Sequence, residues 1–356
     1  MKHQGDSIRT ILVTGGGGFL GKAIVRLLIK RGDRVISFSR GYYSELEELG
    51  VKQVRGDISN PVAIENAAKG VDTVYHLAAK AGVWGDYKDY YRVNTEGTRN
   101  VIAACKSCGV SRLIYTSSPS VVFDGGDMEG MDETVPYPGS YHAAYPQTKA
   151  LAEQAVRQAG GGLQMTDGGW QRTEEKWQGA GEGLKTIILR PHLIWGPGDN
   201  HLVPQILKRA KRLRRIGNGK NRVDVIYIDN AASAHLLAEE ALIRQSELSG
   251  NVYFISQGKP VFLWKMIDDI LQAGGLPPIN RSISPQAAFR IGAILEWFYK
   301  AFTLKGEPQM TRFVAKELST SHWFDIRAAR RDLGYVPEVS TEEGLRRLAT
   351  YLKTRY

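Results

Sequence analysis

The sequence predicts an α/β protein with a doubly wound parallel sheet and a smaller C-terminal lobe. An apolar stretch of strand type, Ile11–Thr14, leads into glycines and then into helical spacing as far as Leu28. Further strand-like stretches alternate with helix-like stretches up to residue 190, which favours parallel pairing through right-handed crossovers. A length of 356 residues is enough for one large lobe and a second, smaller one.

The glycines after the first strand predict a site for the phosphates of a dinucleotide. Gly15 permits a sharp turn, Gly18 lets the backbone approach a pyrophosphate, and Gly21 lets the helix pack close to the strand. The helix that opens at Phe19 and Leu20 directs free N–H groups and its positive dipole end toward the anion. A glycine-rich loop without a ligand is the alternative, and the flanking strand and helix argue against it.

The end of the second predicted strand, Arg34–Arg40, bears on the choice of nucleotide. A carboxylate about 20 residues beyond the glycines would bind the adenosine ribose of NAD. This chain has Ser39 and Arg40 there instead, and an arginine suits a 2′-phosphate. The sequence therefore favours NADPH/NADP as the cofactor. The alternative is that Arg40 is an exposed loop residue with no role in binding the cofactor.

The stretch Val54–Ile58 is predicted to be a short third strand whose end contributes to the cofactor site. Asp57 could reach the adenine amino group there, with Ile58 beside it. Asp57 could equally be a turn residue or a helix cap before Pro61, and the sequence does not separate these alternatives.

A fourth strand, Val71–Ala79, is predicted to end in small residues. Ala78 would leave room for the nucleotide to cross the edge of the sheet. We expect His76, inside the same stretch, to be a packed, hydrogen-bonded histidine and not an acid or base. Cys105 and Cys108 alone make a poor metal site, so no metal is expected.

Chemistry is expected at the carboxyl end of the fifth predicted strand, Leu113–Ser118, because ligands of such sheets lie beyond the strand ends. Tyr145 and Lys149 follow on a predicted helix that runs to about Gln158. Their spacing of four places them on one helical face. Ser118, Tyr145 and Lys149 are therefore the catalytic candidates.

These residue types suit hydride transfer to or from a carbonyl carbon. An adjacent ammonium stabilises a phenolate, so Lys149 is expected to lower the pKa of Tyr145 and to hydrogen-bond the nicotinamide ribose. Ser118 would hold the substrate oxygen in line with Tyr145, which exchanges a proton with that oxygen. A tyrosine and a lysine at this spacing also occur by chance on amphipathic helices.

A series of short motifs runs through the chain. They are Thr14-Gly15-x-x-Gly18-x-x-Gly21, Gly56-Asp57, His76-x-Ala78-Ala79, Asn94-x-x-Gly97-Thr98, Tyr115-Thr-Ser-Ser118, Tyr145-Pro-x-x-Lys149, and Arg190-Pro191 to Gly196-Pro197-Gly198. Together they resemble the extended short-chain dehydrogenases/reductases, and within these the 3β-hydroxysteroid dehydrogenase branch. The resemblance implies a Rossmann domain with a substrate lobe, and it adds Asn94 to the catalytic candidates.

Three further stretches, Ala79–Gly85, Arg190–Asp199 and His322-Trp-Phe, are similar to a bacterial subgroup that reduces 2-alkyl-3-oxoalkanoates with NADPH in olefin hydrocarbon biosynthesis. This resemblance implies a lipid-like β-keto acid substrate and a 2-alkyl-3-hydroxyalkanoate product. The alternative enzyme is a 3β-hydroxysteroid or sterol-4-carboxylate 3-dehydrogenase. The alternative of another class is a non-catalytic NADP-sensing binding protein.

The predicted domains divide the chain near its middle. Residues 1–190 are expected to form the NADP-binding Rossmann domain, and residues 191–356 mainly the substrate lobe. Segments near 223–235 and 251–256 are expected to return to the Rossmann domain, with strands predicted at Val223–Ile228 and Asn251–Ser256.

A glycine-rich insertion at residues 160–183 lengthens the link that follows the Tyr145 helix. Its composition is typical of a mobile surface excursion. Trp170 and Trp177 within it leave a partner-binding role open.

The stretch Phe289–Leu304 is rich in aromatic and aliphatic residues. Arg290, Glu296 and Lys300 interrupt it, so it lacks the apolar length needed to cross a bilayer. Helical spacing is expected to place these three charges on one side. The wide aromatic face opposite them is open to three interpretations: core packing, the lining of a tunnel for alkyl chains, or shallow membrane contact.

The composition, 42% hydrophobic and 24% charged, is that of an ordinary globular protein. Two cysteines and no secretory-type leader predict a cytoplasmic location. The net charge of +10 is densest in Lys208–Arg222, which suits a solvated face, an anionic ligand or partner, or a membrane. No interleaved aromatics accompany it, so nucleic acid is not expected. A homodimer is expected, and partner enzymes of the same pathway and peripheral membrane contact are left open.

Overall fold

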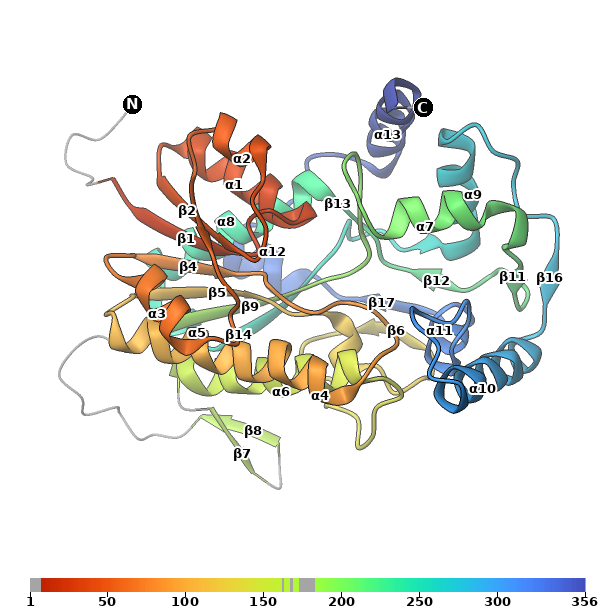
Figure 1. Cartoon of the computed structure of the whole chain (residues 1–356), viewed down its shortest axis with the longest axis horizontal. Helices are drawn as coiled ribbons and strands as arrows, with labels where there is room; N and C mark the ends of the chain where they lie inside the picture. The colour runs from red at the N-terminus through yellow and green to blue at the C-terminus, as the bar shows by residue number, and fades with distance from the viewer. Residues whose placement is uncertain (1–7, 162, 167–168, 173–182, 356) are drawn as a thin grey trace.

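The computed structural model describes residues 8–161, 163–166, 169–172 and 183–355 (Figure 1). Its centre is a seven-stranded sheet of order β14-β9-β5-β4-β1-β2-β3, in which every neighbouring pair is parallel. The strands are β1 (Thr10–Thr14), β2 (Arg34–Ser39), β3 (Lys52–Arg55), β4 (Thr73–His76), β5 (Arg112–Thr116), β9 (Lys185–Pro191) and β14 (Asn251–Ile255).

Helices cover both faces of this sheet, α1, α8 and α12 on one side and α3, α5 and α6 on the other (Figure 1). Their bounds are α1 (Phe19–Arg31), α3 (Pro61–Ala68), α5 (Gly97–Ser107), α6 (Ala144–Gly161), α8 (Ile228–Arg244) and α12 (Arg327–Leu333). In β1, Ile11 and Val13 join the core on one face and Leu12 joins the core on the other. A strand buried on both faces is apolar at every position, which confirms the doubly wound α/β prediction.

The third strand differs from its prediction. It ends at Arg55, so the predicted bounds Val54–Ile58 are wrong, and Asp57 lies in the turn that follows. The Asp57 carboxylate accepts hydrogen bonds from the backbone N–H and the hydroxyl of Ser59, at 2.9 and 2.5 Å. Such a local side-chain bond competes with strand pairing and ends the strand early. The cap of α3 is Asn60, not Asp57.

The C-terminal lobe is built from short strands and helices. The strands are β6 (Met128–Met131), β10 (Ile194–Trp195), β11 (Arg215–Ile216), β12 (Arg222–Val223), β13 (Ile226–Tyr227), β15 (Val261–Phe262), β16 (Ser282–Ile283) and β17 (His322–Phe324). The helices are α7 (Leu202–Arg209), α9 (Leu263–Ala273), α10 (Pro285–Ala301), α11 (Arg312–Glu317) and α13 (Thr341–Arg355), with a short helical turn η3 (Ala210–Arg212). The short turn η4 (Ser246–Leu248) lies between α8 and β14 and packs on α8 and β9.

The stretch Val223–Ile228 does not form one strand in the large sheet. Its two ends pair in separate small sheets, β12 with β15 and β17, and β13 with β10. The chain then returns through α8, which packs on α1, and through β14, which pairs with β9. The predicted strand Asn251–Ser256 is confirmed to within one residue.

The glycine-rich insertion is partly described. Helix α6 continues through Gly161, and β7 (Leu163–Thr166) pairs antiparallel with β8 (Gly169–Arg172). Trp170 lies in β8, opposite Met165. Trp177 and the rest of the stretch up to residue 182 lie outside the described residues.

Helix α10 contradicts the prediction made for its charges. Glu296 is buried and its carboxylate binds Arg312, whereas Arg290 and Lys300 are exposed. Core packing is also wrong for most of its aromatic side chains, because they lie on the exposed face. No helix in the described part of the chain is long and apolar enough to cross a membrane.

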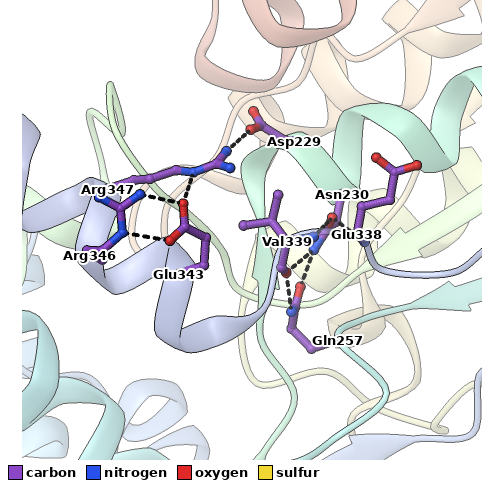
Figure 2. A network of polar contacts seen from close by, with 8 residues as sticks. All are labelled: Asp229, Asn230, Gln257, Glu338, Val339, Glu343, Arg346 and Arg347. Atoms are coloured by element: carbon purple, nitrogen blue, oxygen red, sulfur yellow. Dashed lines mark hydrogen bonds and ion pairs between the residues drawn. The ribbon is translucent and has the colours of Figure 1, made fainter.

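A polar network holds the C-terminal segment against the Rossmann domain (Figure 2). Asn230, buried at the start of α8, donates hydrogen bonds to Gln257 Oε1 at 2.6 Å and to the Val339 carbonyl at 2.8 Å. Its Oδ1 accepts from the backbone N–H groups of Glu338 and Val339, both at 3.0 Å. Asn230 therefore satisfies backbone groups that no regular element pairs.

We expect Asn230→Ala to lower the free energy of unfolding by about 2–4 kcal/mol, because it leaves several buried polar groups unpaired. The exposed Asn66→Ala on α3 is the control and should cost less than about 0.5 kcal/mol. Urea denaturation of both variants measures this. Equal losses would show that the network in Figure 2 does not hold the C-terminal segment.

Candidate active site

The predicted catalytic residues meet where β5 ends beside α6. Ser118 follows β5 and caps the helical turn η2 (Pro119–Val122), with its Oγ accepting from the Ser120 N–H at 3.2 Å. Tyr145 and Lys149 lie in the first two turns of α6, one helical turn apart. Tyr145 lies close enough to Ser118 for this side chain to lower the pKa of the phenol. The strand end and the helix thus bring together residues that are 27 positions apart in the sequence, Ser118 and Tyr145.

The Lys149 ammonium is buried and directed at the end of β5. Its Nζ donates to the Thr116 carbonyl at 2.7 Å and lies 4.2 Å from the centre of the Tyr115 ring. Burial lowers the pKa of Lys149 to about 7, and the Glu153 carboxylate opposes that shift. This lysine therefore titrates close to neutral pH in the free protein.

The Tyr145 phenol behaves differently from the expectation. Burial raises the pKa of Tyr145 above its ordinary value, the Ser118 hydrogen bond lowers it, and the Glu317 carboxylate raises it. The predicted lowering by Lys149 is not seen: Lys149 is not among the groups that shift this pKa, and its Nζ donates to the Thr116 carbonyl. The phenol is therefore held in its protonated form at neutral pH.

An ion pair lies directly behind these residues. The Arg190 guanidinium of β9 donates to both carboxylate oxygens of Glu153 on α6, at 3.1 and 2.6 Å, and both side chains are fully buried. Ser117 and Tyr137 donate to the same carboxylate. The pKa of Glu153 stays below its usual value although burial alone would raise it, because Arg190 stabilises the carboxylate.

Asn94 lies in a π-helical turn, η1 (Tyr91–Glu96), that precedes α5. Its Oδ1 accepts from the Lys80 N–H at 2.7 Å, and its Nδ2 donates to the Lys80 carbonyl and to Thr148 Oγ1, both at 3.1 Å. Helical turns of this kind occur mostly at functional sites. Asn94 thus joins the segment after β4 to the residue next to Lys149.

His76 is buried, and its ring nitrogens lie 2.7 Å from Thr14 Oγ1 and 3.0 Å from Thr98 Oγ1. Burial, with a smaller contribution from the Lys149 charge, lowers the pKa of His76 to about 3. The predicted packed, hydrogen-bonded and neutral histidine is confirmed.

The turn after β1 has the shape that a dinucleotide requires. Gly15 has a φ of 72°, and a Cβ there would lie 3.0 Å from the Ala78 backbone nitrogen. A Cβ on Gly21 would lie 2.2 Å from the Gly15 carbonyl oxygen. No side chain caps α1 at Gly18 and no acidic residue lies in its first turn, so the helix start at Phe19 remains suited to an anion.

The other cofactor candidates surround this turn at the strand ends. Ser39 Oγ accepts from the Gly17 N–H at 3.4 Å, and Arg40 next to it is exposed. Asp57 lies close enough for the Arg40 charge to lower its pKa, after the larger effects of burial and of Ser59. Ile58 is buried, and a Cβ on Gly97 would lie 2.7 Å from its Cδ1, so Ile58 packs against α5.

Two acidic residues near the site, Glu153 and Glu317, were not identified from the sequence. Glu153 extends the spacing of four that relates Tyr145 to Lys149, so the same helical pattern would have found it. Glu317 ends α11 in the C-terminal lobe, and burial raises the pKa of its carboxyl to about 7. No local pattern links Glu317 to the tyrosine that its charge affects.

Comparison with known proteins agrees with this geometry. The sequence model of the 3-beta hydroxysteroid dehydrogenase/isomerase family matches residues 12–283. The 2-alkyl-3-oxoalkanoate reductase of Stenotrophomonas maltophilia is 48% identical over 95% of this chain and 98% of that protein. The protein of the same name from Shewanella oneidensis is 46% identical over 96% and 85%. A solved UDP-glucuronic acid 4-epimerase from Bacillus cereus shares the fold, with a TM-score of 0.70 at 21% identity over 98% of this chain and 99% of that one.

The parallel sheet, the glycine turn and the helix with Tyr145 and Lys149 define the class: the chain is an oxidoreductase with the fold of the extended short-chain dehydrogenases/reductases. Within that class it belongs to the 3-beta hydroxysteroid dehydrogenase/isomerase family. The family resemblance drawn from the motifs is confirmed.

The lowered pKa of Lys149 makes stability depend on pH. Between pH about 7 and 10.5 the unfolded chain keeps this proton while the folded protein has lost it, so the contribution of Lys149 to the free energy of unfolding rises with pH. At and below pH 7 the folded protein holds a buried ammonium, at a cost of up to roughly 5 kcal/mol. We expect Lys149→Met to be more stable than the parent near pH 6 and to lose that advantage toward pH 10.

Urea denaturation of parent and variant across that pH range measures the difference. The exposed Lys106→Met on α5 is the matched control and should show no such trend. A stability difference for Lys149→Met that stays constant with pH would contradict the assignment.

Proposed function

We propose that this protein catalyses the NADPH-dependent reduction of a 2-alkyl-3-oxoalkanoate to the 2-alkyl-3-hydroxyalkanoate. The observation that carries the proposal is the convergence of Ser118, beyond the end of β5, with Tyr145 and the buried Lys149 on α6, where Lys149 Nζ donates to the Thr116 carbonyl at 2.7 Å. A phenol that keeps its proton at neutral pH suits the donation of that proton to a ketone oxygen, which is the direction of reduction. Full-length similarity to reductases of that name supports the substrate class.

The cofactor would lie along the carboxyl ends of the strands. The turn from Gly15 to Gly21 would hold the pyrophosphate against the start of α1. Arg40 and Ser39 at the end of β2 would bind the 2′-phosphate of the adenosine ribose. When bound, the nicotinamide supplies the hydride that reaches the substrate carbon.

The chain's own residues handle the proton and the substrate oxygen. Ser118 donates a hydrogen bond to the ketone oxygen, and Tyr145 delivers its proton there as hydride arrives at carbon. Lys149, held by Thr116 and Tyr115, would hydrogen-bond the nicotinamide ribose when the cofactor is bound. Asn94 positions this lysine through its contact with Thr148, so we assign it a positioning role.

The second candidate function is oxidation of a 3β-hydroxysteroid or a sterol-4-carboxylate, and the description of the family favours it. The same residues would serve it, with Tyr145 accepting the proton. A cytoplasmic location, a homodimer, a place in olefin hydrocarbon biosynthesis and partner enzymes from that pathway stay predictions.

We expect Tyr145→Phe to lower kcat for reduction of a 2-alkyl-3-oxo acid by about 10²–10⁴-fold, because the proton donor is lost. NADPH affinity should stay within about twofold, and the exposed Tyr42→Phe is the matched control. Two assays are run in parallel: NADPH oxidation with the 2-alkyl-3-oxo acid, and NAD(P) reduction with a 3β-hydroxysteroid. If the parent protein turns over only the steroid, the proposed substrate is wrong and the second candidate function is favoured. If it binds NADPH but turns over neither compound, a cofactor-sensing protein is favoured.

We expect Arg40→Asp to weaken NADPH binding by about 10- to 100-fold and to leave NADH binding unchanged or tighter, because a charge-assisted bond to phosphate is replaced by repulsion. Fluorescence titration with both cofactors measures this. The exposed Arg34→Asp at the other end of β2 is the control. An unchanged preference for NADPH over NADH would show that the 2′-phosphate is bound elsewhere. Arg55 would then be the next residue to test, because it pairs with Ser39 between β2 and β3.

A further inference from the structure

Helix α10 lies at the edge of the C-terminal lobe and packs mainly on α11 (Figure 1). Its inner face is narrow, formed by Ala288, Gly292 and Glu296, all buried. Gly292 allows the close approach, since a Cβ there would lie 2.6 Å from the Thr311 backbone. The other side chains of the helix are half-buried or exposed.

The exposed side of α10 is rich in large apolar side chains. Those of α10 and the turn after it are Phe289, Ile291, Ile294, Trp297, Phe298, Phe302 and Leu304, with exposures of 37, 44, 55, 62, 43, 60 and 49%. Contiguous exposed apolar patches of this kind mark interaction sites. We call these seven residues the α10 face.

The charges around the α10 face are basic. Arg290 and Lys300 lie on the helix and Lys305 in the turn after it, and all three are exposed. None of them forms an ion pair with a described residue, whereas Glu296 is occupied by Arg312. The helix therefore combines aromatic side chains with unneutralised cations.

The basic run found in the sequence lies next to this helix. Strand β11 pairs with β16, which leads directly into α10, and Arg209 donates to the Gln309 carbonyl at 3.5 Å, just beyond the α10 face. The run's exposed cations are Lys208, Lys211, Arg212, Arg214, Lys220 and Arg222, and none of these is paired with an acid among the described residues. One end of the lobe thus carries an apolar helix beside a cationic band.

We propose that this end of the C-terminal lobe docks on an anionic lipid bilayer, with α10 lying in the plane of the interface. Helices that bind in this way carry tryptophan, phenylalanine and leucine on one face and lysine or arginine beside it. Each cation near an anionic surface adds attraction, and the apolar side chains enter the boundary between headgroups and acyl chains.

The charge pattern favours a lipid surface over a second copy of the chain. A symmetric dimer through the α10 face would bring two bands of the same sign together, which is unfavourable. The docked surface also lies close to the catalytic elements. Trp84 contacts Tyr299 of α10 with ring centres 6.2 Å apart, and Glu307 accepts from the Val83 N–H at 3.3 Å. The same segment begins at Lys80, which Asn94 holds.

The test is cosedimentation of the full chain with vesicles. We expect binding to vesicles of phosphatidylcholine with phosphatidylglycerol, weaker binding to phosphatidylcholine alone, and weakening as salt rises. Trp297→Ser with Phe298→Ser, and separately Lys211→Glu with Lys305→Glu, should each reduce partitioning by about tenfold or more. NADPH affinity and turnover of a short-chain soluble substrate should be unchanged in all of them.

Matched variants lie away from this end of the lobe. Val62→Ser with Ile243→Ser changes exposed apolar residues on α3 and α8, and Lys106→Glu with Lys353→Glu changes exposed cations on α5 and α13. Neither should alter vesicle binding. No binding to the anionic vesicles, or equal loss in the matched variants, would overturn the proposal. So would a dimer in sedimentation velocity that Trp297→Ser dissociates, since this would assign the α10 face to a second copy. Docking is independent of which substrate is reduced.

Discussion

The buried ion pair between Glu153 and Arg190 is the interaction on which the catalytic arrangement depends. It joins α6 to β9, and through Ser117 it also holds the end of β5. Removing one partner of a buried pair leaves an uncompensated charge and costs about 3–5 kcal/mol. Because Glu153 lies one helical turn beyond Lys149, the pair fixes the helix that carries Tyr145. It also supplies the negative charge that offsets part of the burial of the Lys149 ammonium.

Burial then decides which proton each catalytic candidate keeps. Removing water disfavours the charged form of both side chains, so the pKa of Lys149 falls and the pKa of Tyr145 rises. A protonated phenol and a lysine that titrates near pH 7 are the free protein's resting state. That state suits the proton donation from Tyr145 that we propose.

The C-terminal lobe also affects the electrostatics of the candidate active site. Glu317 at the end of α11 raises the pKa of Tyr145 through its charge, so this lobe influences the candidate proton donor directly. On its outer side the same lobe presents the α10 face and the cationic band to the surroundings. Helix α11 therefore lies between the reaction site and the proposed docking surface, in contact with α10.

The sequence alone determined the parts of the protein that depend on neighbouring residues. The glycine turn, the helix with Tyr145 and Lys149 and the alternation of strands and helices all follow from local backbone preferences and side-chain periodicity. Tertiary structure alone decided the rest. The partners of Glu153, the influence of Glu317 and the exposure of Trp297 depend on which segments pack over them. Burial and charge pairing join residues far apart in the chain, and no local pattern records that.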